Sequence, residues 1–312
     1  MDIDPRQLEA LTSGLKVKFT DWEPCQTVQV EGFAPIYFPN AAGKRSDNLP
    51  GGSCAENIRG AYAQPDQCYE PLITAFFIWL RDRRPELSMI DVGALWGHTS
   101  FIAASIFKRS TIHMLEMNPF VAEILRGNVD LNRHLKAEFH VNNMLISKFD
   151  KQMPVTFKHY TARYGTGEGG INLSPLKIFR ENFKSGIKRI LRRPTRGEYI
   201  KKQMRIATID TYCEEQAFVP NLIKIDVEGS EYDVLLGARE TLQRYHPIVL
   251  AEFHTPGDAN YVQKTNCELV RLMEESHYRC LWSNFRDRDA MLHHIDSHTD
   301  LNIETNSVGI FY

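Results

Sequence analysis

The chain has 312 residues, of which 43% are hydrophobic and 24% are charged, and its formal net charge is -2. This composition is ordinary for a globular protein and excludes a disordered or fibrous chain. The longest apolar run, Leu72–Leu80, is too short to cross a bilayer. Six cysteines form no Cys-x-x-Cys pair, and the first residues are acidic where a signal peptide would be basic. We therefore expect a cytoplasmic protein with reduced, buried thiols.

The first 68 residues predict an irregular extension that packs on the main domain. Prolines and glycines are scattered through it, with β-like pieces at Thr27–Val30 and Ile36–Phe38 and a loop over Asn40–Ser53. A helix is predicted over Leu72–Arg83, and it stops near Pro85 because proline cannot continue a helix.

From Leu87 onward, predicted strands and helices alternate, which is typical of α/β folds. Four helices are predicted between the strands by their apolar spacing. The last two strands indicate a terminal antiparallel hairpin. The predicted strands are Ser88–Val92, Thr111–Leu115, Glu138–Asn142, Val155–Tyr160, Leu222–Ile225, Ile248–Ala251, Arg279–Ser283 and Ser307–Tyr312. The predicted helices are Thr99–Phe107, Phe120–Asn132, Glu231–Arg244 and Asn260–Glu275.

An insertion at residues 161–205 interrupts this alternation. It opens with a glycine-rich loop, and between Leu176 and Arg205 it holds eleven Lys or Arg residues against two acidic ones. Phe179 and other apolar residues recur at helical spacing, so we expect an amphipathic basic helix over Ser174–Leu191. Such a helix is either a solvated face, a lid that attracts an anionic acceptor, or a contact with an anionic membrane surface.

Two strands end in acidic residues and glycines, and each is followed by a helix. We call each of these strand-to-helix junctions a switch. The first switch contains Asp91, Gly93 and Gly97, and the second contains Asp226 and Glu228. In an open α/β sheet, ligands bind beyond the carboxyl ends of the strands, so both switches should border one site.

Three blocks of sequence carry a family resemblance. The chain reads Asp91-Val-Gly-Ala-Leu-Trp-Gly97, then Leu115-Glu116-Met-Asn118-Pro119, then Ile223-Lys-Ile-Asp-Val-Glu-Gly-Ser-Glu231. With Tyr69-Glu70-Pro71 and Ile209-Asp210-Thr-Tyr, these blocks resemble the FkbM-type family of S-adenosylmethionine-dependent methyltransferases from about Tyr69 to His254. Leu95 and Met117 depart from the family pattern, which has Asn and Pro there. The resemblance implies a doubly wound, mostly parallel, seven-stranded Rossmann-like sheet.

The resemblance also implies where S-adenosylmethionine binds. The Gly93/Gly97 turn would hold its methionine portion near Asp91, and Glu116 would accept both ribose hydroxyls. Asn142 or Asn143 would face the adenine edge or the loop beneath it, although an asparagine there is equally a turn former. The expected cofactor-binding residues are Glu70, Asp91, Gly93, Gly97, Thr99, Glu116, Asn118, Asn143 and Asp226.

Methyl transfer to a hydroxyl needs alignment and a group that takes the proton, and Asp226, His254, Glu228 and Glu252 are the catalytic candidates. The imidazole of His254 suits a general base, or alternatively makes a structural hydrogen bond. Glu231 is expected to favour a helix N-terminus rather than to catalyse. No two oxygen or nitrogen ligands share a tight motif, so no metal is predicted. A metal-assisted reaction through Asp226, Glu252 and His254 is the alternative.

The sequence thus predicts an extension (1–68) and a methyltransferase domain (69–312) that methylates a hydroxyl of a small molecule or glycan. The acceptor would be a sugar, glycolipid or polyketide-type molecule, anionic or lipid-linked if the basic insertion binds it. A nicotinamide-dependent dehydrogenase is disfavoured because the first turn lacks Gly-x-Gly-x-x-Gly. A nucleic-acid methyltransferase using the basic insertion is the other alternative, and it is disfavoured because no aromatic-interleaved RNA motif is present. A non-enzymatic scaffold is disfavoured because competent residues fill both the cofactor and acceptor positions.

Overall fold

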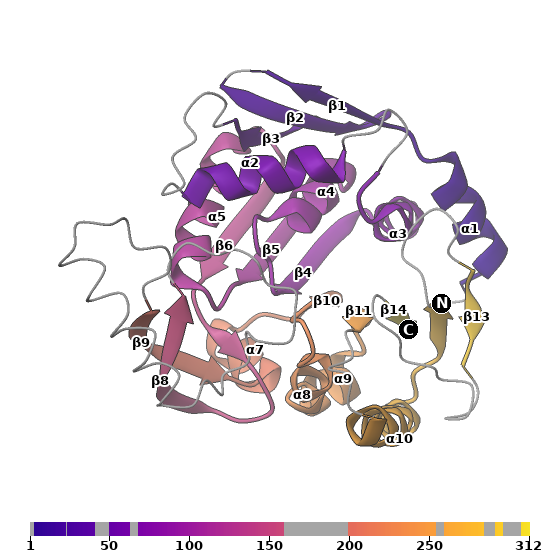
Figure 1. Cartoon of the computed structure of the whole chain (residues 1–312). Coiled ribbons are helices and arrows are strands. Elements are labelled where there is room, and N and C mark those ends of the chain that lie inside the picture. The colour runs from indigo at the N-terminus through magenta and orange to yellow at the C-terminus, as the bar shows by residue number, and fades with distance from the viewer. Residues whose placement is uncertain are drawn as a thin grey trace.

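The computed structural model describes residues 3–22, 24–40, 50–62, 68–158, 199–253, 259–283, 291–295 and 307–312. Its centre is an eight-stranded sheet with the order β13-β12-β14-β11-β10-β4-β5-β6 (Figure 1). The five neighbouring strands from β11 to β6 in this order, including β10, β4 and β5, are parallel, whereas β14, β12 and β13 pair antiparallel. This order, which reverses direction beside β4, confirms the predicted doubly wound sheet and its terminal hairpin.

The strand bounds agree with the prediction to within a few residues. The sheet consists of β4 (Glu86–Val92), β5 (Arg109–Leu115), β6 (Ala137–Asn142), β10 (Leu222–Ile225), β11 (Ile248–Phe253), β12 (Cys280–Ser283), β13 (His293–His294) and β14 (Ser307–Phe311). The two-residue β13 makes eight strands where seven were predicted. Strands β10 and β11 are buried at every position, as expected for parallel strands covered on both faces.

Helices cover both faces of this sheet (Figure 1). One face carries α3 (Pro71–Arg81), α4 (His98–Ile106) and α5 (Pro119–Leu131), and the other carries α7 (Ile209–Gln216), α8 (Glu231–Leu236), α9 (Arg239–Tyr245) and α10 (Ala259–Glu275). Alternate strand residues feed two hydrophobic clusters: Met89 and Leu222 belong to the first, Ile90 and Ile223 to the second. The two-residue side-chain period of a strand produces this division.

The predicted helix Glu231–Arg244 is divided into α8 and α9 at Gly237. A Cβ at Gly237 would lie 2.2 Å from the carbonyl oxygen of Ser147, so the chain packs there on bare backbone. The capping carboxylate comes from another element, because Asp210 accepts the backbone N–H groups of Glu240 (3.1 Å) and Thr241 (2.7 Å). The helix spacing was predicted correctly, and its interruption was not.

The structure contains a second sheet that the sequence analysis did not predict. Strand β9 (Tyr199–Ala207) lies between β7 (Leu145–Ile146) and β8 (Lys151–Lys158). Residues 155–158, the described part of the predicted strand Val155–Tyr160, therefore belong to this sheet and not to the central one. Because β9 begins at Tyr199, the last part of the predicted 161–205 insertion is a strand that pairs with β8. The predicted helix Ser174–Leu191 lies outside the described residues.

The N-terminal extension is more regular than predicted. It contains α1 (Pro5–Gly14), an antiparallel sheet of β1 (Val17–Asp21), β2 (Cys25–Val30) and β3 (Ile36–Pro39), and α2 (Pro50–Ala61). Helix α2 starts inside the predicted loop Asn40–Ser53, of which residues 41–49 lie outside the described range. The buried side chains of this segment join the first hydrophobic cluster, which continues into α3 and α4.

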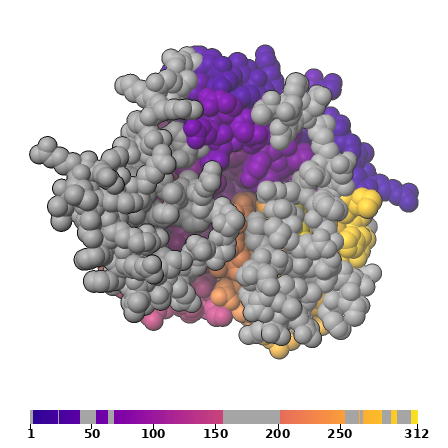
Figure 2. Space-filling view, viewed as in Figure 1, coloured from indigo at the N-terminus to yellow at the C-terminus, as the bar shows by residue number. Residues whose placement is uncertain are grey.

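Both chain ends lie on the same side of the molecule, near β13 (Figure 1). In the space-filling view, indigo and purple N-terminal residues form the upper part, with yellow C-terminal residues at the right (Figure 2). A hydrogen bond of 2.8 Å from the Leu292 N–H to the Glu9 carboxylate links the two regions. Within the described part of the chain, no helix has both the length and the apolarity to cross a membrane. Five cysteines at described positions are free thiols; Cys54, Cys213 and Cys280 are buried as predicted, whereas Cys25 and Cys68 are half-buried.

Candidate active site

The turn between β4 and α4 requires glycine at two positions. Gly93 and Gly97 both have φ of +83°, in the left-handed region that favours glycine. A Cβ on Gly93 would lie 1.8 Å from the carbonyl oxygen of Asp226, and one on Gly97 would lie 2.7 Å from side chains including Met114 and Leu125. The first switch is therefore packed directly against the second, as their predicted place at one sheet edge requires.

Leu95 lies in the same turn with φ of +48°, although leucine rarely adopts this conformation. The family pattern has Asn there, and Asn tolerates the left-handed region better. The backbone N–H of Leu95 donates to Glu116 Oε2 at 3.1 Å. Leucine in place of asparagine therefore leaves the turn intact but strains its backbone. The Leu95 N–H still donates to Glu116 in the neighbouring loop.

Glu116 follows β5 and is buried, with 5% of its surface exposed. Its other carboxylate oxygen, Oε1, accepts the N–H of Asn118 at 2.7 Å. Burial raises the pKa of Glu116 to about 7, the two backbone hydrogen bonds lower it, and the charges of Asp91 and Asp226 add to the rise. A carboxylate oxygen accepts more than one hydrogen bond, so Glu116 can link the two loops and still accept hydroxyl donors.

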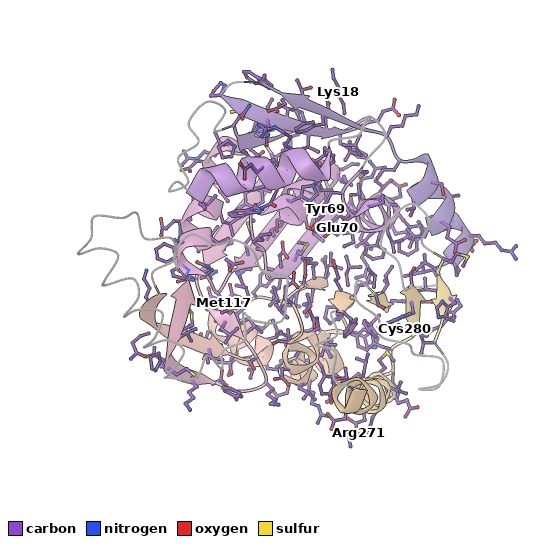
Figure 3. The ribbon with its side chains drawn as sticks, in the orientation of Figure 1. Lys18, Tyr69, Glu70, Met117, Arg271 and Cys280 are labelled. Atoms are coloured by element: carbon purple, nitrogen blue, oxygen red, sulfur yellow. The ribbon has the colours of Figure 1, made fainter. Side chains whose placement is uncertain are left out.

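The two predicted asparagines shape the loop around Glu116. The side chain of Asn118 caps α5 by accepting the N–H groups of Phe120 (2.9 Å) and Val121 (3.4 Å). The amide of Asn143 donates to the carbonyl oxygens of Glu116 (2.8 Å) and Met117 (2.9 Å). Both are therefore structural residues of the predicted cofactor loop, and their contact with a cofactor stays a prediction. Met117 packs against the apolar cluster of the second sheet (Figure 3).

Glu70 reaches the same place from the residue before α3. It is 5% exposed, has φ of +49°, and its Oε2 accepts the Thr99 hydroxyl at 3.3 Å. Figure 3 shows Glu70 near the centre of the molecule, between the upper helices and the end of β10. One oxygen each from Glu70, Asp226 and Glu252 lie within 4.8 Å of one another. The structure thus brings together three predicted site residues that are far apart in sequence.

Lys224 is a site residue that the sequence analysis missed. It is 3% exposed, and its Nζ lies 3.1 Å from Asp226 Oδ2 and 3.7 Å from Asp91 Oδ1. Asp91 is fully buried and also accepts the Ser100 hydroxyl at 2.6 Å. Burial raises the pKa of Asp91, while Lys224 and Ser100 lower it. A lysine between two isoleucines of a buried strand was the available signal, because lysine is almost never buried without a partner.

The two glutamates after Asp226 have different places. Glu228 is exposed, has φ of +55°, and is not among the three carboxylates that converge. Glu231 is 1% exposed, and its oxygens accept the N–H of Gly229 at 2.9 and 3.1 Å. Glu231 thus closes the turn before α8, in line with its predicted structural role. His254, the other catalytic candidate, lies outside the described residues.

A buried aromatic group borders the first turn, and sequence analysis did not single it out. His98 begins α4, and its Nε2 is hydrogen-bonded to the hydroxyl of Tyr62. Its ring lies 5.2 Å from that of Tyr69, edge to face. Burial lowers the pKa of His98 to about 3, and the charge of Lys224 contributes. His98 is therefore neutral at physiological pH and ties α4 to the N-terminal extension.

The family model described as the methyltransferase FkbM domain matches residues 91–280, more than half of the chain. The chain therefore belongs to the FkbM-type family of S-adenosylmethionine-dependent methyltransferases, as its motifs predicted. No curated protein matches it.

Solved structures similar to this chain are distant in sequence. Methyltransferase FkbM from Methylobacillus flagellatus KT is 15% identical with a TM-score of 0.37; the match covers 84% of this chain and 60% of that protein. An O-methyltransferase from Bacillus cereus, in complex with SAH, is 10% identical with a TM-score of 0.40, covering 87% and 92%. A putative O-methyltransferase from Klebsiella pneumoniae is 10% identical with a TM-score of 0.42, covering 82% and 86%. These likenesses are too distant to indicate a substrate.

Proposed function

We propose that this protein transfers a methyl group from S-adenosylmethionine to a hydroxyl oxygen of a small molecule or glycan. The observation that carries the proposal is the convergence of Glu70, Asp226 and Glu252 at one sheet edge, beside the glycine turn that follows β4. Acidic groups at this place suit an acceptor that must lose a proton, and they suit the positive charge of a sulfonium.

The residues of the turn fit the cofactor by their chemistry. The first turn of α4 presents N–H groups that have no partner within the helix, which suits the carboxylate of a methionine. Glu116 offers carboxylate oxygens for two ribose hydroxyls, and Asn143 supports the loop beside it. S-adenosylmethionine would supply an electrophilic methyl carbon, open to attack in line with the departing sulfur. The remaining cofactor contacts, through Glu70, Thr99 and Asp91, are part of this proposal.

The acceptor end is formed by Asp226 and Glu252. In such a transfer the acceptor oxygen would bond to the methyl carbon as the carbon–sulfur bond breaks and its electron pair goes to sulfur. The proton released from the hydroxyl needs a base, and a carboxylate of Asp226 or Glu252 can take it. Because alignment dominates such a displacement, the fixed position of Asp226 matters as much as its basicity. His254 and Glu228 remain proposed contributors on the sequence alone.

The direct test is methylation of a panel of neutral and acidic sugars and polyketide-type alcohols with labelled S-adenosylmethionine. We expect the label in a methyl group bonded to an oxygen of one acceptor class, located by mass spectrometry. Asp226→Asn should lower turnover by at least about tenfold with little change in cofactor affinity, since its interaction develops at the acceptor. Transfer to nitrogen or carbon would reject the hydroxyl assignment, and equal activity of Asp226→Asn would reject the proposed acceptor end.

Metal-assisted transfer is the second candidate, and the three converging carboxylates favour it. Carboxylate oxygens are ligands that Mg²⁺ prefers, and a bound ion would make the acceptor hydroxyl more acidic. Against this, the ammonium of Lys224 already lies within 3.1 Å of Asp226. Treatment with EDTA should leave the activity intact. A loss that Mg²⁺ restores would make the metal-assisted reaction the better account.

The acceptor class is proposed from the basic insertion, most of which lies outside the described residues. The eleven basic residues between Leu176 and Arg205 would attract an anionic acceptor such as an acidic glycan, a glycolipid head group or a phosphate-bearing carrier. Changing Lys188, Arg189, Arg192 and Arg193 to Gln should raise the acceptor KM and spare cofactor binding. Unchanged acceptor kinetics at low salt and unchanged liposome binding would reject this role. Salt-dependent binding to RNA or DNA would instead support the nucleic-acid alternative. A cytoplasmic location remains part of the proposal.

A further inference from the structure

Lys224 holds a central position among the carboxylates of the site. It pairs in register with Asp91 of the neighbouring strand β4, so both side chains lie on the same face of the sheet. Its ammonium is 3.7 Å from Asp91 and 3.1 Å from Asp226, and only 4% of its side chain is exposed. One fixed cation therefore connects the residue nearest the glycine turn with the residue proposed at the acceptor end.

The charge around Lys224 is strongly negative. Burial opposes its positive charge most, but the carboxylates of Asp226, Asp91, Glu70 and Glu252 together outweigh this effect and raise its pKa. Two carboxylates within 3.7 Å thus face the Lys224 ammonium. Four buried or half-buried carboxylates around one ammonium would repel one another if that ammonium were removed, since like charges in a poorly solvated site are costly.

We propose that Lys224 is a positioning residue: its ammonium is the built-in cation of the carboxylate cluster, in the role that a divalent ion has in metal-assisted transfer. It holds Asp91 and Asp226 at fixed distances and so links the cofactor end of the site to the acceptor end. This inference rests on the proposed function, because it explains how the carboxylate at the acceptor end stays aligned without a metal. It leaves the identity of the acceptor open.

The test is Mn²⁺ binding to the full-length protein, measured by electron paramagnetic resonance and calorimetry, which needs no acceptor. The wild type and Lys224→Arg should show only weak surface binding. Lys224→Met, which keeps the length of the side chain but loses the charge, should gain one Mn²⁺ site at least about tenfold tighter than the wild-type background. Adding Asp226→Asn to Lys224→Met should abolish that site, because a ligand is lost.

Two results would overturn the proposal. One is a tight Mn²⁺ site in the wild type that Asp226→Asn removes, since the cluster would then hold a metal together with Lys224. The other is a folded Lys224→Met protein that gains no Mn²⁺ site. If Lys224→Met does not fold, Lys224→Gln, which keeps a polar group, is titrated in its place, with folding of each variant checked by circular dichroism.

Two further readouts separate this inference from the proposed function. Lys224→Met should lower S-adenosylmethionine affinity, whereas Lys224→Arg should restore most of it, because either cation can bridge the two aspartates. Ser100→Ala is the matched control, since it removes the hydrogen bond to Asp91 Oδ2 and leaves Asp226 untouched. If these binding assays support the role of Lys224 but no hydroxyl acceptor is methylated, the proposed function is rejected and the inference stands.

Discussion

Gly93 lies where the chain leaves no volume for a side chain. A Cβ there would stand 1.8 Å from the carbonyl oxygen of Asp226, and its φ of +83° already disfavours any other residue. The contact is with backbone rather than with a flexible side chain, so relief requires moving β4 or β10. This single position therefore couples the two strand ends that form the site.

Gly93→Ala should lower the free energy of unfolding by at least about 2 kcal/mol, through strain at positive φ and the clash with Asp226. Urea unfolding measures this change, and calorimetry should show weakened S-adenosylmethionine binding as well. Gly127→Ala is the matched control, because a Cβ on Gly127 meets nothing within 4 Å and lies inside α5. That variant should be neutral or slightly more stable. Equal stability of the two variants would show that the turn is not as closely packed as described.

Glu116 gives the site a pH dependence. Its pKa of about 7 means that the carboxyl group takes up a proton near neutrality. If the ionised form accepts the ribose hydroxyls, S-adenosylmethionine affinity should be constant above about pH 7.5 and fall by up to about tenfold per pH unit below 7. Glu116→Gln should bind at least about tenfold more weakly and show little pH dependence. A pH-independent wild type would contradict the proposed role.

The same carboxyl group affects stability with a defined sign. Because its folded-state pKa is raised from 4.5 to about 7, its contribution to stability is fully present below pH 4.5 and is lost as pH rises through 7. The free energy of unfolding of the cofactor-free wild type should therefore decline between pH 4.5 and about pH 7, and Glu116→Gln should remove this decline. Unfolding measured at several pH values tests both.

At the scale of elements, the N-terminal sheet docks on the end of α5 through Asn132. Its side chain accepts the N–H of Tyr37 and donates to the carbonyl oxygen of Tyr37, both at 2.8 Å, and it is fully buried. A further bond of 2.8 Å runs to the carbonyl oxygen of Asn128. The edge of β3 is thus paired with a side chain in place of another strand.

Asn132→Ala should lower the free energy of unfolding by about 2–3 kcal/mol, because it leaves both backbone groups of Tyr37 without their partners. Chemical denaturation measures the loss, and hydrogen exchange should show faster exchange in β3. Asp130→Ala, an exposed change on the same helix, should cost less than about 0.5 kcal/mol. If the two variants unfold alike, the side chain of Asn132 does not hold the N-terminal sheet in place.

The elements that sequence predicted well have strong local signals. Strand β10 is a short apolar run that ends in charged residues, and α3, α4 and α5 have apolar spacing over several turns. The missed elements depend on distant partners. Strand β9 mixes basic and apolar residues without a regular period and pairs with β7 and β8. Helix α7 is short, with Thr208 as its capping residue. The block Ile209-Asp210 of the family pattern is explained by structure: Asp210 caps α9.

The site residues divide in the same way, into those with a local sequence signal and those that depend on distant partners. The positions of Asp91, Gly93, Glu116 and Asp226 could be predicted because each lies at or just after the end of a strand that the sequence marks clearly. The approach of Glu70 to Asp226 and Glu252 could not, because it depends on how α3 packs on the sheet. Lys224 had a visible signal in its apolar surroundings, but its partners become evident only when β10 is placed beside β4.

At the scale of the whole molecule, one sheet brings all the proposed chemistry to a single edge. The described residues of the N-terminal extension share the first hydrophobic cluster with α3 and α4, so this part of the extension packs against elements that form the site. Tyr62, next to α2, illustrates this, since its hydroxyl is hydrogen-bonded to His98 in the first turn of α4. The second sheet packs beside the predicted cofactor loop through Met117.

The central claim is that this edge binds S-adenosylmethionine as the methyl donor. Calorimetric titration of the full-length protein with S-adenosylmethionine, and separately with NADH, tests it most directly. We predict one S-adenosylmethionine per chain, with binding weakened in both Glu116→Ala and Gly93→Ala, and no binding of NADH. Binding of NADH, or an S-adenosylmethionine affinity that neither variant changes, would contradict the account.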